Sequence, residues 1–257
     1  MNAISDTTVK NRVSQEEWQV RCDLAAAYRV ANELRWTDLI FTHFTARVPG
    51  SEHFLINPYG LLFNEITASN LVKIDEECNV IEDITGCGVN PAGFVIHGCI
   101  HEARPEMNAV LHTHTRAGVA VSAMKTGLLP LSQHAARTLD MLTYHDYEGI
   151  ALDLDERKRL AKNLGKTSRA MILRNHGLLT VGKSIAEAIE VMYYLDAACQ
   201  IQVDAMAAGI DNLVQVDSTV TQKVFEQFET RGGYKMAIDT WHALTRMLDN
   251  KGVEYRI

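Results

Sequence analysis

An apolar stretch from Ala109 to Leu111 leads directly into His112 and His114, two histidines separated by a single residue. In a β-strand alternate side chains share a face, so both imidazoles point the same way, with their Cα atoms roughly 6.6 Å apart. Imidazoles at this spacing can place ring nitrogens about 2.0–2.1 Å from one metal ion. The pattern therefore predicts a strand whose end carries a metal-binding pair.

A metal site needs at least one further protein ligand. A second apolar stretch ends at Leu173 and is followed closely by His176 and Gly177. We therefore predict a three-histidine metal site made of His112, His114 and His176. The alternative is a pair of polar residues on a solvated face, and spacing alone does not separate the two. Seven histidines between residues 97 and 176 exceed what surface chemistry usually requires and favour the metal site.

Length and composition indicate one globular domain over residues 1–257, large enough to bury a core without disulfides. A net charge of −7 disfavours nucleic acid and anionic membranes as partners. No apolar run approaches the roughly 18 residues of a membrane span, and the polar N-terminus has no secretory pattern. Five scattered cysteines without a Cys-x-x-Cys pair indicate reduced thiols and a cytoplasmic location.

The order of predicted elements indicates an α/β fold. A capping box at Ser14–Glu17 begins a helix that is predicted to end near Leu34. Further helices are predicted at 94–103, 117–124, 155–164, from 184 onward, and at 221–228 and 234–248. Strands are predicted at 39–48, 53–56, 71–74, 79–84, 170–173 and 178–181, besides the one that carries His112.

These elements predict a three-layer α/β/α sandwich with a mostly antiparallel central sheet. Residues 1–12 are expected to be frayed, and residues 208–257 to form a C-terminal helical extension. Between the helix at 117–124 and the one at 155–164, a long connection is expected to begin at Gly127 and to contain His134 and Tyr144.

Two motifs resemble the class II aldolase/adducin family: the stretch from Ala103-Arg104-Pro105 to His112-Thr113-His114, and Asn175-His176-Gly177. The similarity runs from about residue 14 to residue 207. It implies the α/β/α sandwich, a homotetramer with active sites near subunit interfaces, and a divalent metal held by the three histidines. Zinc is the metal of the sugar-phosphate aldolases in this family, while manganese and iron(II) also suit such a ligand set.

Departures from the family pattern bear on the substrate. Sugar-phosphate aldolases carry a Ser-Ser-Glu segment with a catalytic glutamate, where this chain has Pro91–Gly93. His43 stands where the family has a phosphate-loop asparagine, and His134 matches a catalytic-loop tyrosine. The chain instead resembles an adducin-like bacterial branch, typified by Asn90–Phe94 and Leu178–Thr180. The resemblance therefore implies that the substrate is not a sugar phosphate handled in the standard way.

A metal ion with three neutral histidines keeps most of its charge and is a good Lewis acid toward a hydroxy-carbonyl or keto-acid oxygen pair. Polarising that group stabilises an enolate, which retro-aldol cleavage and decarboxylation share. The missing glutamate matters less for decarboxylation, because CO₂ departs without prior proton abstraction. We therefore predict a metal-dependent lyase acting on a non-phosphorylated small molecule, with both reactions open.

The acid that protonates the enolate is predicted to be His97, which lies near the position of the lost glutamate and can titrate near neutrality. The competing interpretation is a helix histidine that donates to a backbone carbonyl or to a ligand histidine. His134 and Tyr144 are further catalytic candidates, and His43 and Tyr59 are predicted to line the substrate pocket.

Two other classes of function stay open at this point. Three histidines with open coordination positions also suit iron(II), which can activate oxygen in an oxygenase or oxidative decarboxylase. The third class is a non-catalytic, adducin-like scaffold that keeps the fold for protein interaction.

Overall fold

The computed structural model of the chain describes residues 8–149 and 154–257. Its centre is a mixed eight-stranded sheet with the order β4-β3-β2-β1-β5-β8-β7-β6. The neighbouring strands are antiparallel except β6 and β7, which run parallel. The strands are β1 (His43–Arg47), β2 (Phe54–Ile56), β3 (Val72–Ile74), β4 (Val80–Glu82), β5 (Ala109–Thr113), β6 (Leu142–His145), β7 (Ala170–Leu173) and β8 (Gly177–Gly182).

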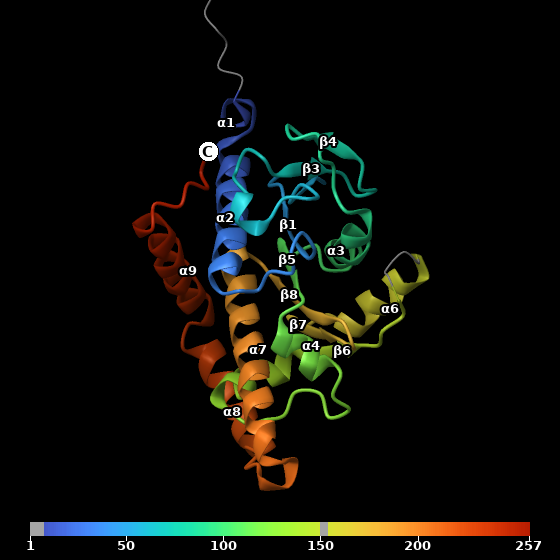
Figure 1. The fold of residues 1–257 in the computed structure, drawn as a ribbon, viewed down its shortest axis with the longest axis vertical. Coiled ribbons are helices and arrows are strands. Elements are labelled where there is room, and N and C mark those ends of the chain that lie inside the picture. Colours follow the sequence, from blue (N-terminus) through green and yellow to red (C-terminus); the bar gives the residue numbers. More distant parts are fainter. Residues whose placement is uncertain (1–7, 150–153) are drawn as a thin grey trace, which may run out of the picture.

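Helices surround this sheet (Figure 1). They are α1 (Val9–Arg12), α2 (Gln15–Glu33), α3 (Pro91–Ala103), α4 (Arg116–Ser122), α5 (Gln133–Thr138), α6 (Leu154–Leu164), α7 (Ile185–Ala205), α8 (Ser218–Thr230) and α9 (Gly233–Asn250). Short 3₁₀ turns occur at Phe63–Glu65, Leu139–Met141, Met206–Ala208 and Ile210–Asn212. None of the helices in the described ranges has both the length and the apolar composition of a membrane span.

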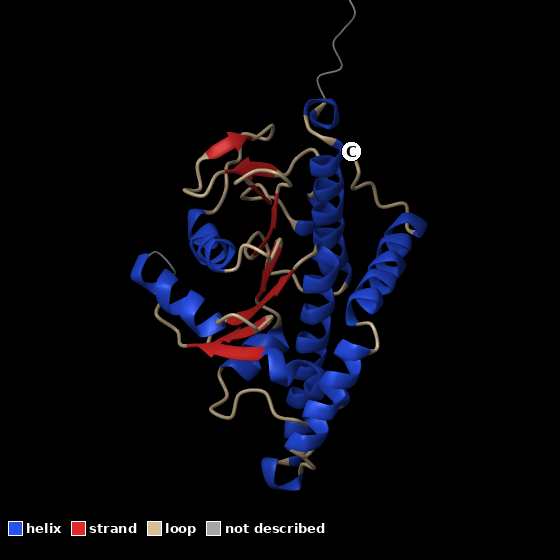
Figure 2. Ribbon diagram, turned by 180° about the vertical axis from the view of Figure 1, so that it is seen from behind, coloured by secondary structure: helices blue, strands red, loops and turns tan. Residues whose placement is uncertain are grey.

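Alternation along the strands explains why helices cover both faces of the sheet. In β5, Ala109 and Leu111 belong to the core that contains residues of α2 and α7. Val110, between them, packs in a separate core with residues of α3 and α6. Figure 2 shows α3 and α6 on one side of the strands and the long helices on the other. The predicted mostly antiparallel sheet is confirmed, with one parallel edge pair that the sequence did not indicate.

The predicted helix start at Ser14 is confirmed, because the Ser14 side chain accepts a hydrogen bond from the Glu17 backbone N–H at 3.1 Å. The same helix carries Arg21, which is fully buried and pairs with Glu17 and with Glu82 of β4. Its guanidinium also donates to the carbonyl of Leu71. This network ties α2 to the outer strands of the sheet.

Two predicted segments differ from the structure. The strand predicted at 39–48 begins only at His43, because Leu39 and Thr42 have positive φ values of 51° and 65°, which a strand cannot accommodate. The prediction of a long connection that begins at Gly127 is wrong, because this segment contains α5 and β6. Ser132 caps α5 by accepting from the Ala135 N–H, and β6 is a four-residue edge strand paired only with β7. Residues 1–7, part of the N-terminal segment predicted to be frayed, lie outside the described residues.

Helix α3 is joined to the sheet by a buried polar contact. The Thr45 hydroxyl of β1 lies 2.8 Å from His97 Nδ1 and 2.8 Å from His101 Nε2, and all three residues are fully buried. Burial is the main cause that lowers the pKa of His101 to about 3 and the pKa of His97 well below its usual value. Both rings are therefore neutral in the folded protein at neutral pH.

We expect acid to destabilise the metal-free protein below pH 6.5. The unfolded chain protonates these histidines near pH 6.5, whereas the folded rings stay neutral, so the unfolded state binds more protons. The free energy of unfolding should fall by about 1.4 kcal/mol per pH unit for each such histidine. Urea titrations at pH 7.5, 6.5 and 5.5 measure the free energy of unfolding. His101→Asn should reduce the dependence of this free energy on pH, whereas His242→Asn, at an exposed position on α9, should leave it unchanged. A wild-type free energy of unfolding that does not change with pH would contradict the expectation.

Candidate metal centre

The ends of three neighbouring central strands, β1, β5 and β8, lie side by side at one end of the sheet. His43 is the first residue of β1 and pairs with His112, near the end of β5. His112 also pairs, on its other side, with Leu179 near the start of β8. His114 follows the end of β5, and His176 immediately precedes β8. The antiparallel pairing of β5 with β8 thus brings together two histidine segments that are more than sixty residues apart in sequence.

Close approach of the strands requires the glycine after His176. A Cβ atom at Gly177 would lie 2.4 Å from the Thr113 carbonyl oxygen and 3.1 Å from the His114 ring. Asn175 turns the chain into β8 with a φ of 55°, a left-handed conformation that asparagine tolerates. The Asn-His-Gly sequence therefore builds the turn that presents His176 to the other two histidines.

The predicted ligand trio is brought together. Ring centroids of His112, His114 and His176 lie 4.6, 4.8 and 4.9 Å apart in the three pairs. One nitrogen from each ring can be chosen so that all three lie within 4.8 Å of one another. This arrangement suits three ligands of a single ion.

Hydrogen bonds fix which nitrogen of each strand histidine faces the centre. His112 Nδ1 donates to the Leu178 carbonyl at 2.9 Å, and His114 Nδ1 donates to the Asp38 carboxylate at 2.8 Å. In neutral rings both Nε2 atoms therefore carry lone pairs, yet they lie 2.9 Å apart. Two lone pairs at this distance repel unless a cation lies between them. A proton could bridge only two of the nitrogens, whereas a divalent metal can also bind the third imidazole, that of His176. A metal ion therefore fits the three-histidine cluster better than a proton.

Burial also prepares the rings to bind a metal. Desolvation, followed by the neighbouring histidines, lowers the pKa of His176 to about 4 and the pKa of His112 well below its usual value. Metal ligation requires the neutral imidazole. The lone pairs are therefore available at neutral pH without loss of a proton.

The cluster lines a pocket of about 390 Å³ whose other walls come from the 41–43 loop, Tyr59, the start of α3 and Tyr147. The predicted substrate residues His43 and Tyr59 both line it. No lysine, arginine or carboxylate belongs to the lining within residues 8–149 and 154–257. The pocket therefore offers histidine, hydroxyl, amide and aromatic groups rather than charged side chains.

His43 occupies space that a side chain at position 93 would need. A Cβ atom at Gly93 would lie 2.8 Å from His43 Cε1 and 2.8 Å from His43 Nδ1. Burial lowers the pKa of His43 to about 3, although a hydrogen bond with the Gly93 backbone opposes the shift. Position 93 can therefore carry no side chain while the imidazole of His43 keeps this place.

The three predicted catalytic residues lie outside the pocket lining. His97 is fully buried behind His43, with the ring centroids 4.2 Å apart. His134 packs against Tyr194, and the Tyr144 hydroxyl accepts a hydrogen bond from the Leu128 N–H at 3.0 Å. The catalytic roles of these three residues stay predictions.

Sequence reasoning missed Asp38 and the aromatic walls of the pocket, Phe41 and Tyr147. Asp38 lies 76 residues before its partner His114, in a turn that no periodic pattern marks. Phe41 and Tyr147 are both partly exposed, at 43% and 55%, and hydrophobic patterning does not select exposed aromatic residues.

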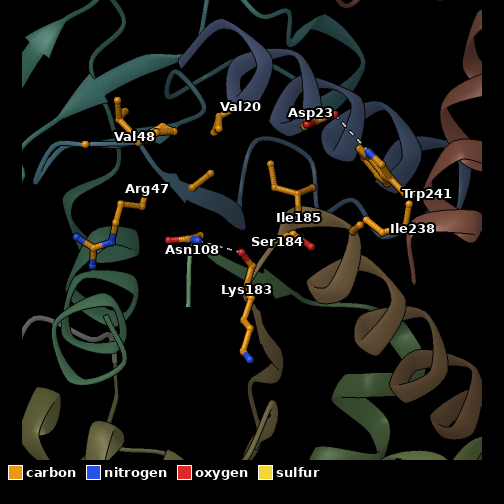
Figure 3. A pocket seen from close by; sticks show the side chains of 14 residues that line it. Val20, Asp23, Arg47, Val48, Asn108, Lys183, Ser184, Ile185, Ile238 and Trp241 are labelled. Atoms are coloured by element: carbon orange, nitrogen blue, oxygen red, sulfur yellow. Dashed lines mark hydrogen bonds between the residues drawn. The ribbon is translucent and has the colours of Figure 1, made fainter. Parts of the chain in front are cut away.

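A second cavity, of about 330 Å³, lies at the opposite ends of β1 and β8 (Figure 3). Val20, Val48, Ile185 and Ile238 give it apolar walls. Its Asp23 accepts a hydrogen bond from Trp241 Nε1 at 3.3 Å. The triad of His112, His114 and His176 is the metal-type cluster found among the described residues, so chemistry is assigned to the histidine pocket.

A family model, the class II aldolase and adducin N-terminal domain, matches residues 22–203. The crystal structure of an aldolase II superfamily protein from Pseudomonas syringae superposes with a TM-score of 0.94 at 55% identity, covering 97% of this chain and 99% of that one. L-fuculose 1-phosphate aldolase from Glaciozyma antarctica superposes with a TM-score of 0.82 at 31% identity, covering 94% and 93%. Alpha-adducin from Rattus norvegicus is 44% identical over 245 residues, which are 91% of this chain and 33% of adducin.

We expect His112→Ala and His176→Ala to abolish binding of zinc while the protein stays folded, because each removes one of three ligands. Asp38→Asn should weaken zinc binding about 10- to 100-fold, because the amide oxygen is a weaker acceptor for His114 Nδ1. Competition titrations with a chromophoric chelator measure these affinities. His134→Ala is the matched control on α5. Full zinc occupancy in either ligand variant would show the ligand assignment to be wrong.

Proposed function

The chain belongs to the class II aldolase and adducin family, and from this premise we propose that it is a metal-dependent carbon–carbon lyase. The observation that carries the proposal is the pair of His112 and His114 Nε2 atoms at 2.9 Å, with His176 beside them. Its substrate is a non-phosphorylated hydroxy-carbonyl compound or keto acid.

A divalent ion held by His112, His114 and His176 would supply Lewis-acid polarisation of a substrate carbonyl or hydroxyl oxygen. Zinc fits three neutral nitrogens with an open position, and manganese or iron(II) suits the same donors. Asp38 and the Leu178 carbonyl keep the strand histidines in the required tautomer. His43 and Tyr59 bind the substrate at the pocket wall.

The charge of the pocket supports the choice of substrate. Arginine and lysine are the side chains that usually bind phosphate, and the described lining contains neither, so the start of α3 is its one phosphate-binding feature. The described lining also lacks a carboxylate that could abstract a proton. Decarboxylation needs no such base before CO₂ leaves, whereas aldol cleavage would require His43, or His97 acting through it, to move a proton. Both reactions belong to the proposal.

Exposed apolar residues beside the pocket support a homotetramer. Leu39 is 71% exposed, and it follows Asp38 in the loop that leads to the pocket residues Phe41 and His43. Phe41 and Tyr147, which line the pocket, are also exposed, at 43% and 55%, and a group of exposed apolar side chains is typical of an interaction surface. We propose that copies of this chain assemble around their active sites.

The similarity to alpha-adducin favours a second candidate, a non-catalytic scaffold. Metal analysis of protein purified without oxygen separates the candidates. Zinc or manganese near one ion per chain, with no oxygen uptake when keto acids are added, supports the lyase. Iron with oxygen uptake would instead indicate an oxygenase, and a metal-free protein would indicate the scaffold.

We expect the metal-loaded protein to release CO₂ or an aldehyde from a panel of hydroxy-carbonyl and keto-acid compounds and to leave their phosphate esters intact. His97→Ala should keep the metal and lower turnover by 10²-fold or more if the ring serves the proton transfer. Enzyme-coupled assays of CO₂ and aldehyde measure this, with His242→Ala, at an exposed position on α9, as the control. Unchanged turnover in His97→Ala would make His97 a structural residue.

A further inference from the structure

The second cavity lies apart from the histidine pocket, and none of the described residues that line it also lines that pocket. We call it the Asp23 cavity, after the one acidic residue in the part of its wall that the structure describes. Helix α2, the end of β1, the start of α7 and helix α9 contribute to this wall (Figure 3). Its volume of about 330 Å³ and its mostly apolar wall are typical of a site that binds a small molecule.

The basic residues of the wall do not direct their charges into the cavity. Arg47 donates from Nη2 to the His101 carbonyl at 2.9 Å, and its guanidinium lies over the Phe54 ring, 4.8 Å from the ring centroid. Lys183 is exposed. Figure 3 shows that both side chains extend away from Asp23. The described wall therefore presents no cation to a negatively charged ligand.

The start of α7, which also borders the cavity, is closed to an anion. The Ser184 hydroxyl accepts a hydrogen bond from the Glu187 N–H at 3.3 Å, and the Glu187 carboxylate accepts one from the Lys183 N–H at 2.8 Å. This capping box uses two backbone donors and places a negative charge at the positive end of the helix. Asn108 is engaged as well, because its side chain donates to the Lys183 carbonyl at 3.0 Å.

Asp23 is the charged group that remains in the wall. Each of its oxygens accepts one hydrogen bond from a neutral donor, Oδ1 from Trp241 Nε1 at 3.3 Å and Oδ2 from Gln19 Nε2 at 3.2 Å. A carboxylate can accept about four hydrogen bonds, so Asp23 keeps acceptor capacity for a further donor. Asp23 forms no salt bridge with any residue in the described ranges.

The charge of this carboxylate is only partly compensated. Burial is the main cause that raises the pKa of Asp23 above its usual value, and the hydrogen bonds to its oxygens oppose the shift only in part. The charges of Arg256 and His242 also oppose the shift, but Arg256 is already paired with Asp249 at 2.6 Å. A cation bound inside the cavity would offset the cost of burying the Asp23 charge.

We propose that the Asp23 cavity binds a small primary amine that has an apolar body. The ammonium group donates to the Asp23 carboxylate, and the body packs against Val20, Ile185 and Ile238. Trp241, which is only 6% exposed, completes the apolar wall beside the carboxylate. The proposal concerns a site separate from the three histidines, so it depends neither on a bound metal nor on the proposed lyase function.

Isothermal titration calorimetry of the metal-free protein at pH 7.5 tests the proposal with two probes that differ in one group. 2-Phenylethylamine carries an ammonium group, and 2-phenylethanol carries a hydroxyl in its place. The wild type should bind the amine about tenfold more tightly, because a hydrogen bond between two charged groups is much stronger than a neutral one. Asp23→Asn keeps the size of the side chain and an acceptor for Trp241, and it should remove this preference. Asp211→Asn, at an exposed position, is the matched control and should keep it.

Two further variants locate the bound amine. Val20 is only partly buried, so Val20→Phe can extend into the cavity without disturbing the core. This variant should bind neither probe, while its circular dichroism spectrum stays that of the folded protein. His112→Ala, in the histidine pocket, should bind the amine as tightly as the wild type does.

The wild type alone can overturn the proposal, either by binding neither probe or by binding both equally well. A preference for the amine that persists in Asp23→Asn would also overturn it, as would amine binding that survives in folded Val20→Phe. Loss of amine binding in His112→Ala would place the amine in the histidine pocket and would contradict a separate site.

Discussion

The structure of the site depends on two hydrogen bonds that hold protons away from its centre. The Leu178 carbonyl takes the Nδ1–H of His112, and the Asp38 carboxylate takes that of His114. In neutral rings these two bonds leave a lone pair on each Nε2 atom, and the two atoms lie 2.9 Å apart. This contact is unfavourable without a cation between the two atoms. The pairing of β5 with β8 and the loop at Asp38 therefore both favour the binding of a cation. Without either acceptor a ring could take the other tautomer, and the same pair would become an ordinary hydrogen bond.

The ligands and the strands that carry them could be predicted because the signals are local. Alternation places His112 and His114 on one side of a strand, and Asn175-His176-Gly177 specifies a turn. The partners of these residues could not be predicted. Asp38 lies in a loop whose conformation depends on the positive φ angles of Leu39 and Thr42. Neither leucine nor threonine is a residue type that predicts a positive φ angle. Edge strand β6 escaped prediction for a related reason, since its one partner, β7, lies far along the chain.

The histidines of this region divide into two groups with different partners. His112, His114 and His176 present lone pairs to a common point, which suits a cation. His97 and His101 instead both hydrogen-bond to the Thr45 hydroxyl, on the side of β1 that packs against α3. Burial keeps members of both groups neutral, because it lowers the pKa of His101 and of His112. A count of histidines in the sequence foretold a site but could not have separated these groups.

His43 joins the two groups, and the space beside Gly93 explains why. The imidazole lies where any side chain at position 93 would begin, 2.8 Å from the place of its Cβ atom. A chain of this fold can therefore have a side chain at position 93 or an imidazole at position 43 in this orientation, but not both. The choice changes the chemistry of the pocket wall, because a carboxylate adds negative charge and a base, whereas a neutral imidazole adds no charge. The absence of a side chain at position 93 and the presence of His43 are thus one structural alternative, and the described pocket lining that results carries no charged side chain.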